Sequence, residues 1–215
     1  MVVILAGGPI KDYQRIKKLI KEGCRIICAD GGAVHAKAMG VKPDLIIGDM
    51  DSVSEEVLQH YRLNGVETCP FPREKDEVDT ELAIEKAVKL GCREILLLGA
   101  TGGRIDHTLG NIHLLVKAAN LGVKATMVDE RHRISLATAQ QGVKICGPIG
   151  GLVSLLPLTT EVTGVTSTGL KWELNDGSFR IGKPFGISNE LVDTAALVSV
   201  KEGILAVIEV LNEEK

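Results

Sequence analysis

Closely spaced aspartates in the first half of the chain are the residues best suited to chemistry. Asp49 and Asp51 stand two apart in Gly-Asp-Met-Asp-Ser, Asp30 lies in Ala-Asp-Gly-Gly-Ala, and Asp76 and Asp79 follow. In an extended segment, residues two apart point to the same side, so Asp49 and Asp51 can face one cation. Two or three carboxylates suffice for Mg²⁺, which also keeps waters and substrate phosphates. The spacing therefore predicts a magnesium site, and the simpler alternative is a turn in which both side chains bind backbone amides.

A second polar segment, residues 101–107, has the sequence Thr-Gly-Gly-Arg-Ile-Asp-His. Gly102 allows backbone N–H groups to approach a phosphate near a helix start, as do two earlier glycine pairs. Arg104 can bind a phosphate through two parallel hydrogen bonds. Asp106 has two interpretations of similar weight, since it can orient Arg104 or cap the following helix. The chain has no Walker A motif and no GxGxxG, so neither a P-loop kinase nor a standard dinucleotide site is supported.

The elements that must position these residues alternate between apolar strands and amphipathic helices. Strands that are apolar throughout and separated by helices indicate a parallel sheet covered on both faces. Such sheets bind ligands outside the carboxyl ends of their strands, which is where the aspartates and Arg104 fall. The expected strands are residues 2–6, 25–29, 43–47 and 95–98, and the expected helices are residues 12–21, 54–64, 79–90 (with Asp79 as N-cap) and 106–119.

The helical period disappears from about Glu130. Short β-type runs follow, separated by glycines and by the turn sequence Asn-Asp-Gly at residues 175–177. These runs are residues 134–136, 151–156, 161–165, 170–174, 191–200 and 205–210. We therefore expect an α/β protein with a parallel-sheet, Rossmann-like N-terminal domain (residues 1–130), followed by an all-β domain, a sandwich or barrel (residues 131–215).

The composition is that of a folded soluble protein. Apolar residues make up 45% and charged residues 25%, and the formal net charge of −3 gives no general attraction to nucleic acid or membranes. No apolar run has the length of a membrane span, and the N-terminus lacks the features of a signal peptide. The five cysteines include no CxxC pair, so we expect reduced thiols and a cytoplasmic protein.

Trp172, the sole tryptophan, has two interpretations. Core packing is the simpler one, and a platform for a cationic or heteroaromatic ligand is the other.

Taken together, these motifs resemble the thiamine pyrophosphokinase (thiamine diphosphokinase) family. Segments in the family's order span nearly the whole chain. They are residues 29–33, 43–52, 79–82, 102–107, 168–172 and 187–189.

The resemblance implies an α/β domain that binds ATP and Mg²⁺, followed by a β-sandwich that binds thiamine and forms a homodimer. It places the active sites between subunits. The implied reaction transfers the diphosphoryl group of ATP to thiamine, which gives thiamine diphosphate and AMP.

The resemblance also assigns roles by matching position. By this match, Mg²⁺ and the phosphates are bound by Asp49, Asp51 and Asp79, and Asp30 is also in the catalytic set. Nucleotide contacts fall to Lys75, Asp76, Gly102, Arg104 and Asp106. Thiamine contacts fall to Trp172, Ser188 and Asn189. Lys75 stands where eukaryotic relatives commonly have glutamine, and a lysine suits a phosphate contact.

Two other functions are compatible with the same aspartates. One is a different magnesium-dependent transferase, such as a glycosyltransferase or a pyrophosphokinase that acts on a pterin-like alcohol. The other is a nucleotide-sensing protein without turnover. The second is disfavoured because a protein that only binds nucleotide gains little from gathering so many like charges.

Overall fold

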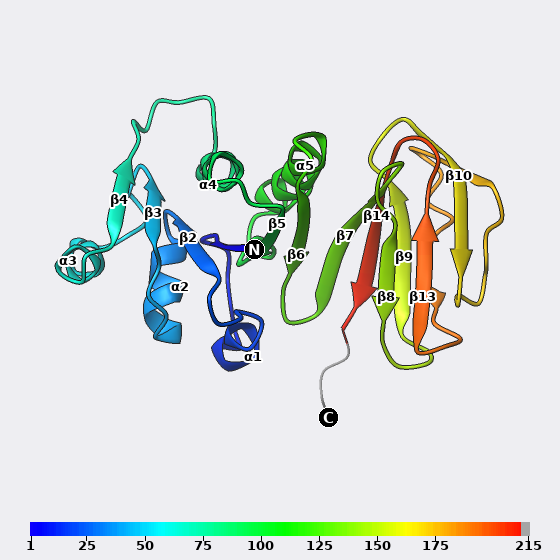
Figure 1. Cartoon of the computed structure of the whole chain (residues 1–215), viewed down its shortest axis with the longest axis horizontal. Helices are drawn as coiled ribbons and strands as arrows, with labels where there is room; N and C mark the ends of the chain where they lie inside the picture. The colour runs from blue at the N-terminus through cyan, green and yellow to red at the C-terminus, as the bar shows by residue number, and fades with distance from the viewer. Residues whose placement is uncertain (212–215) are drawn as a thin grey trace. The chain divides into compact units, whose positions relative to one another are not determined.

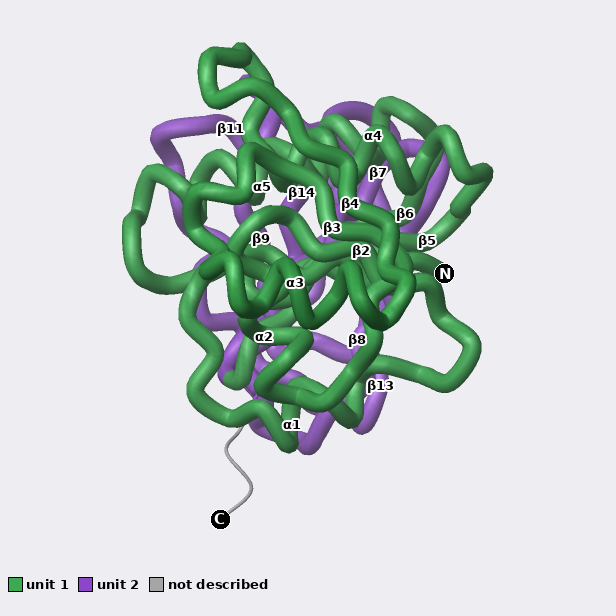
Figure 2. The backbone as a smooth tube through the Cα atoms, turned by 90° about the vertical axis from the view of Figure 1, so that its left-hand side faces the viewer, with its two compact units in different colours: residues 1–130 green, residues 131–215 purple. Residues whose placement is uncertain are grey.

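The structure, a computed structural model, describes residues 1–211. It divides into two compact units, Met1–Glu130 and Arg131–Lys215, coloured separately in Figure 2. Within the described part of the chain, no helix combines the length and the apolar character needed to cross a membrane.

The first unit is built on a parallel sheet (Figure 1). Its strands are β1 (Val2–Leu5), β2 (Arg25–Ala29), β3 (Leu45–Gly48), β4 (Glu67–Pro70), β5 (Glu94–Leu98) and β6 (Lys124–Val128). They lie in the order β6-β5-β1-β2-β3-β4, and every adjacent pair is parallel. The chain moves outward from β1 to β4 and then returns to β5 on the other side of β1. Strand order therefore reverses between β1 and β5, and ligands bind at such reversal points.

Five helices cover the faces of this sheet. They are α1 (Tyr13–Lys17), α2 (Gly32–Met39), α3 (Glu55–Leu63), α4 (Asp79–Lys89) and α5 (Ile105–Asn120). Figure 1 shows α4 and α5 on one side of the sheet and α1 and α2 on the other. Of the four residues expected on the apolar face of α4, Leu82, Ala83 and Ala87 are buried, whereas Leu90 lies just beyond the helix and is exposed. The α/β class predicted for this half of the chain is therefore confirmed.

Helix α1 is shorter than the predicted residues 12–21. Asp12 caps it as an aspartate should, and its Oδ1 accepts a hydrogen bond from the amide of Arg15 at 2.9 Å. Beyond Lys17 the amides of Leu19 and Ile20 bond three residues back, so the α-helical pattern ends in tight turns.

The second unit consists of two antiparallel sheets. Their strand orders are β12-β9-β14-β7 and β11-β10-β13-β8. The strands are β7 (His132–Thr138), β8 (Val143–Cys146), β9 (Leu152–Pro157), β10 (Glu161–Thr168), β11 (Gly177–Arg180), β12 (Asn189–Glu190), β13 (Ala195–Ser199) and β14 (Ile204–Val210). One core joins the two sheets, with Leu155 and Val207 from the first packing with Val165, Val198 and Phe179 from the second. The predicted all-β class is confirmed, and the unit is a sandwich.

Two strands predicted in this unit are wrong or too long. Residues 170–174 form no strand, and only Leu170 makes a bridge, to Leu191. The main chain of Trp172 bonds instead to a side chain, that of Asn189. Strand β13 begins at Ala195, because residues 192–194 bend away from the extended form expected for residues 191–200.

Candidate active site

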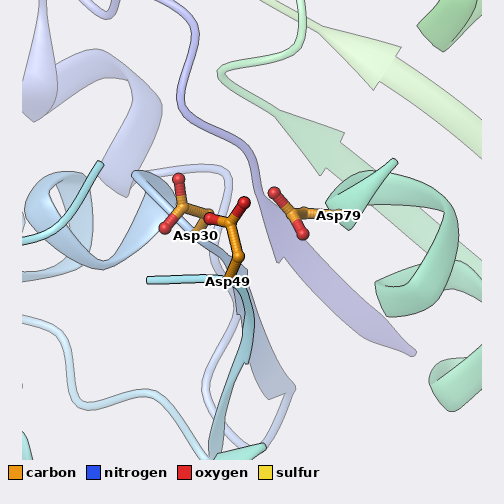
Figure 3. A group of neighbouring side chains, drawn as sticks. All are labelled: Asp30, Asp49 and Asp79. Carbon is orange, nitrogen blue, oxygen red and sulfur yellow. The ribbon is translucent and has the colours of Figure 1, made fainter. Parts of the chain in front are cut away.

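Three aspartate side chains meet at the carboxyl edge of the parallel sheet. Asp30 directly follows β2, Asp49 directly follows β3, and Asp79 is the first residue of α4. One carboxylate oxygen from each lies within 4.8 Å of the others. Figure 3 shows the three carboxyl groups turned toward one another. We refer to Asp30, Asp49 and Asp79 as the aspartate cluster.

The carboxylates of the cluster are crowded together and partly buried. Asp30 is only 7% exposed, and Oδ1 of both Asp30 and Asp79 is buried without a hydrogen-bond partner. Burial raises the pKa of Asp30, and the negative charges of Asp79 and Asp49 raise it further, while hydrogen bonds from Ser52 oppose the shift. Crowded carboxylates with buried oxygens that accept no hydrogen bond are suitable ligands for a hard divalent cation. The residues present therefore fit Mg²⁺.

The backbone beneath the cluster has special conformations. Asp30 has a left-handed φ of 42°, and Gly48, the last residue of β3, has a φ of 143°. A Cβ on Gly48 would lie 3.0 Å from Cγ and Oδ1 of Asp79 and from Cβ of Asp30. Only glycine lets the strand pass under these side chains without displacing them.

Two sequence expectations about the cluster are wrong in their geometry. Met50 has a φ of 64°, so the segment from Asp49 to Asp51 is not extended. The amide of Asp51 donates to Asp49 Oδ1 at 3.1 Å, as the turn interpretation expects for Asp49, whereas the carboxylate of Asp51 contacts the side chains of Ser52 and Arg73. The N-cap of α4 is Val78, and Asp79 directs its carboxylate to the cluster instead of capping the helix.

Asp51 lies outside the cluster. Its side chain is 43% exposed and forms an ion pair with Arg73 at 3.2 Å. Ser52 Oγ also donates to Asp51 Oδ1 at 3.1 Å. The three carboxylates that the structure brings together are therefore not the predicted metal set, because Asp30 takes the place given to Asp51.

The loop of residues 71–78 brings cations to these carboxylates. Lys75 Nζ lies 2.9 Å from Asp79 Oδ1 in an ion pair, without a hydrogen bond between them. The ammonium also donates to the carbonyl of Pro72 at 3.4 Å, and its side chain is only 11% exposed. Asp76 is exposed and does not join the cluster.

Arg104 and Asp106 form a two-point ion pair at the start of α5. Arg104 Nε donates to Asp106 Oδ1 at 3.2 Å, and Nη2 donates to Oδ2 at 2.6 Å. This pairing lowers the pKa of Asp106 to about 2. Asp106 Oδ1 also accepts the amide of His107 at 3.0 Å. Asp106 thus orients Arg104, whereas the N-cap position of α5 is Arg104 and Asp106 lies in the first turn of the helix. Gly102, which precedes both residues, has a left-handed φ of 77°.

Sequence reasoning missed the residues that fix the loop after β1. His35 Nε2 donates to the carbonyl of Gly8 at 2.8 Å, and its Nδ1 accepts from Tyr13 Oη at 3.0 Å. Burial lowers the pKa of His35, which suits this neutral tautomer. Glu130 Oε1 accepts the amides of Lys11 and Asp12 at 2.6 and 3.1 Å. An acidic residue just after the apolar strand 124–128 was the available signal.

The predicted thiamine residues lie in the second unit. Trp172 is 56% exposed, so core packing is ruled out, and Lys171 Nζ lies 4.8 Å from its ring centre. Both polar atoms of the Asn189 side chain are used: Oδ1 accepts the Trp172 amide at 3.1 Å, and Nδ2 donates to the Trp172 carbonyl at 2.9 Å. Ser188 is exposed with a φ of 62°, and its amide donates to Ser154 Oγ at 3.1 Å.

Comparison with known proteins assigns both units to one family. Residues 16–127 match the family model described as the thiamin pyrophosphokinase catalytic domain, and residues 131–205 match its vitamin B1 binding domain. The chain belongs to the thiamine pyrophosphokinase family. It is therefore an enzyme, a transferase of the kinase class in thiamine diphosphate biosynthesis, and the family's name describes diphosphoryl transfer to thiamine.

Individual thiamine pyrophosphokinases agree with this membership. The curated enzyme of Bacillus subtilis is 30% identical over 95% of this chain and 96% of its own length. The crystal structure of the Bacillus subtilis enzyme has a TM-score of 0.87 at 28% identity, covering 99% of each chain. That from Geobacillus thermodenitrificans has a TM-score of 0.85 at 30% identity, covering 100% of this chain and 99% of its own.

Proposed function

We propose that the aspartate cluster of this thiamine pyrophosphokinase binds Mg²⁺ together with the polyphosphate of ATP. The observation that carries the proposal is the meeting of three carboxylates within 4.8 Å, with the oxygen Asp30 Oδ1 buried and unpartnered. Asp30, Asp49 and Asp79 would hold the cation. Asp51 would join through its exposed carboxylate once it leaves Arg73, or through a water of the metal.

The nucleotide would lie along the carboxyl edge of the parallel sheet. Arg104 presents a guanidinium already oriented by Asp106, and Gly102 leaves the backbone before α5 open to a phosphate. Lys75 supplies a further positive charge beside Asp79. Asp76, exposed in the same loop, would contact the nucleotide from its rim.

The reaction forms a bond between the thiamine hydroxyl oxygen and the β-phosphorus, breaks the bond from that phosphorus to the oxygen of AMP, and releases the hydroxyl proton. Bound Mg²⁺ would neutralise the charge that develops on the phosphate oxygens. The protein's part is to hold the two reactants in line and to keep Arg104 and Lys75 directed at the phosphates. Positioning of this kind accounts for a large share of the rate in phosphoryl transfer.

Thiamine would bind at Trp172 in the second unit. The exposed indole offers a flat face to the cationic thiazolium, and cation–π contacts of this kind favour tryptophan. Asn189 would act by holding the backbone of Trp172, since both of its polar atoms already contact that backbone. Ser188, exposed beside it, would contact thiamine directly.

We propose that the enzyme is a homodimer in which each active site takes its aspartate cluster from one subunit and its Trp172 from the other. The family resemblance supports this arrangement. We also place the enzyme in the cytoplasm, since all five cysteines are free thiols, as a reducing compartment requires.

One assay tests the chemistry. Purified protein is incubated with thiamine, ATP and Mg²⁺, and thiamine diphosphate and AMP are separated by chromatography, with Asp49→Asn in parallel. We expect equal amounts of both products, and both should be lost on adding EDTA and in the variant. AMP without thiamine diphosphate would indicate another acceptor, and undiminished activity of Asp49→Asn would exclude the cluster as the metal site.

A further inference from the structure

The loop of residues 71–78 places two cationic side chains on the carboxylates proposed to bind Mg²⁺. Lys75 pairs with Asp79, and Arg73 pairs with Asp51. The two contacts differ in burial. The Arg73 side chain is 81% exposed, whereas Lys75 is 11% exposed and Asp79 is 25% exposed. Exposed ion pairs contribute little, so Lys75 is the cation that matters for the cluster.

The position of Lys75 is not explained by hydrogen bonding to the carboxylate. Asp79 Oδ1 has the ammonium at 2.9 Å and no hydrogen-bond partner, and Asp30 Oδ1 has no partner at all. The ammonium donates a long hydrogen bond, 3.4 Å, to the Pro72 carbonyl of its own loop. The ammonium is therefore held beside the cluster mainly by its charge.

We propose that Lys75 is a built-in counter-ion of the aspartate cluster, which Mg²⁺ displaces and which then turns to the polyphosphate. The proposal rests on the proposed metal site and adds a competition to it. One ammonium offsets part of the negative charge of three carboxylates while no metal is bound. A divalent cation at Asp79 repels that ammonium at short range, and a nucleotide phosphate then offers it a new partner.

The proposal predicts effects of opposite sign in two titrations of Lys75→Gln. Mg²⁺ alone should bind the nucleotide-free variant about fivefold more tightly than the parent protein, because no ammonium competes for Asp79. ATP at saturating Mg²⁺ should bind the variant about fivefold more weakly, because a phosphate contact is lost. A lysine that only supported the fold would weaken both affinities or neither.

Calorimetry at constant ionic strength measures both affinities without turnover. Lys75→Arg keeps the charge and should behave as the parent protein does. Lys37→Gln is the matched control, because it removes a lysine paired with Glu56 at 2.9 Å in the same unit but away from the loop, and both affinities should stay unchanged. Thermal melting in EDTA verifies that each variant is folded.

The outcomes separate this inference from the metal site itself. If Asp49→Asn abolishes Mg²⁺ binding and Lys75→Gln leaves it equal or weaker, the counter-ion role is wrong and the metal site stands. If Asp49→Asn binds Mg²⁺ as the parent protein does, the metal site fails and the inference fails with it. Tighter Mg²⁺ binding together with weaker ATP binding in Lys75→Gln alone supports the inference.

Discussion

Asp30 is the residue at which the needs of folding and of metal binding oppose each other. Its burial and its two like-charged neighbours raise its pKa, so its ionised form is costly while no metal is bound. Because the pKa in the folded protein lies above that in the unfolded chain, the favourable contribution of the protonated form is present at low pH. It is lost as the pH rises through the folded pKa.

Asp30→Asn should therefore stabilise the metal-free protein while abolishing Mg²⁺ binding. At neutral pH in EDTA we expect a gain of about 1 kcal/mol, which corresponds to a Tm roughly 2–4 °C higher for a chain of this size. The gain should shrink as the pH falls through the raised pKa of the folded protein and disappear near the unfolded value of 3.8, below which Asp30 is neutral in both states. Differential scanning calorimetry across pH 4–8 measures it, and Asp176→Asn, an exposed aspartate paired with Lys201, serves as the control. A lower Tm for Asp30→Asn at every pH would contradict the argument.

Substitution of Trp172 should change the KM for thiamine and little else. Trp172→Ala removes a half-exposed ring, so we expect an unchanged Tm and a KM for thiamine raised about tenfold, while the KM for ATP stays the same. Trp172→Phe should restore most of the affinity. Steady-state kinetics with each substrate varied in turn checks this, and an unchanged thiamine KM in the alanine variant would remove Trp172 from the acceptor site.

At the scale of elements, the end of β3 is the most constrained point in the first unit. Gly48→Ala combines an unfavourable φ with a Cβ 3.0 Å from the Asp79 carboxyl group. We expect a loss of about 1–3 kcal/mol and at least tenfold weaker Mg²⁺ binding, because Asp79 must move.

Gly122→Ala separates these two causes. Gly122 also has a positive φ, 75°, but nothing lies within 4 Å of its added Cβ. This variant should lose stability and keep Mg²⁺ affinity. Equal Mg²⁺ affinities in the two variants, measured by calorimetry, would show that crowding at Gly48 does not hold the cluster.

The elements that the sequence predicted well are those with a strong apolar pattern. β1, β2 and β5 are apolar runs that are followed closely by glycine or aspartate. Because parallel strands all end at the same edge of the sheet, the polar residues that follow them were expected to lie together at that edge. Helix α2 was not predicted, because it has only eight residues, is rich in alanine and begins at a glycine. This glycine, Gly32, packs against the Leu5 carbonyl. Packing on β1, which no local pattern reports, explains it.

The sequence predicted which aspartates lie near the site better than it predicted how their side chains are arranged. The spacing of Asp49 and Asp51 suggested that both carboxylates bind one cation. The left-handed backbone of Met50 between them instead turns the two side chains in different directions. The participation of Asp30 depends on β2 and β3 lying side by side. Tertiary pairing of this kind decides which carboxylates meet, and a linear spacing does not contain it.

At the scale of the whole molecule, the proposed dimer has a test that needs both units. Asp49→Asn should damage the proposed metal site, and Trp172→Ala should damage the proposed thiamine site. If each active site combines residues of two subunits, a mixed dimer of the two variants contains one intact site. Equal mixing after reversible dissociation should then restore about a quarter of the parent activity at low thiamine concentration.

The alternative arrangement gives a different result. If Asp49 and Trp172 of the same subunit serve the same site, every site in the mixture carries one of the two changes and no activity returns. Light scattering on the parent protein, whose chain is 23.0 kDa, establishes whether a dimer forms at all. Mixing two preparations of the same variant is the control for recovery caused by the procedure itself.

The hydrogen bonds between the Asn189 side chain and the main chain of Trp172 bear on which substitutions residue 172 can accept during evolution. The two hydrogen bonds engage only the amide and the carbonyl of residue 172, so they would form equally well with any side chain there except proline, which has no amide N–H. An exposed position with a fixed backbone accepts mutation at little cost to folding. With Trp172 at the acceptor site, as we propose, new acceptor preferences would arise there without loss of the scaffold. Randomising this single codon and selecting on thiamine analogues is therefore a direct route to altered substrate choice in this enzyme.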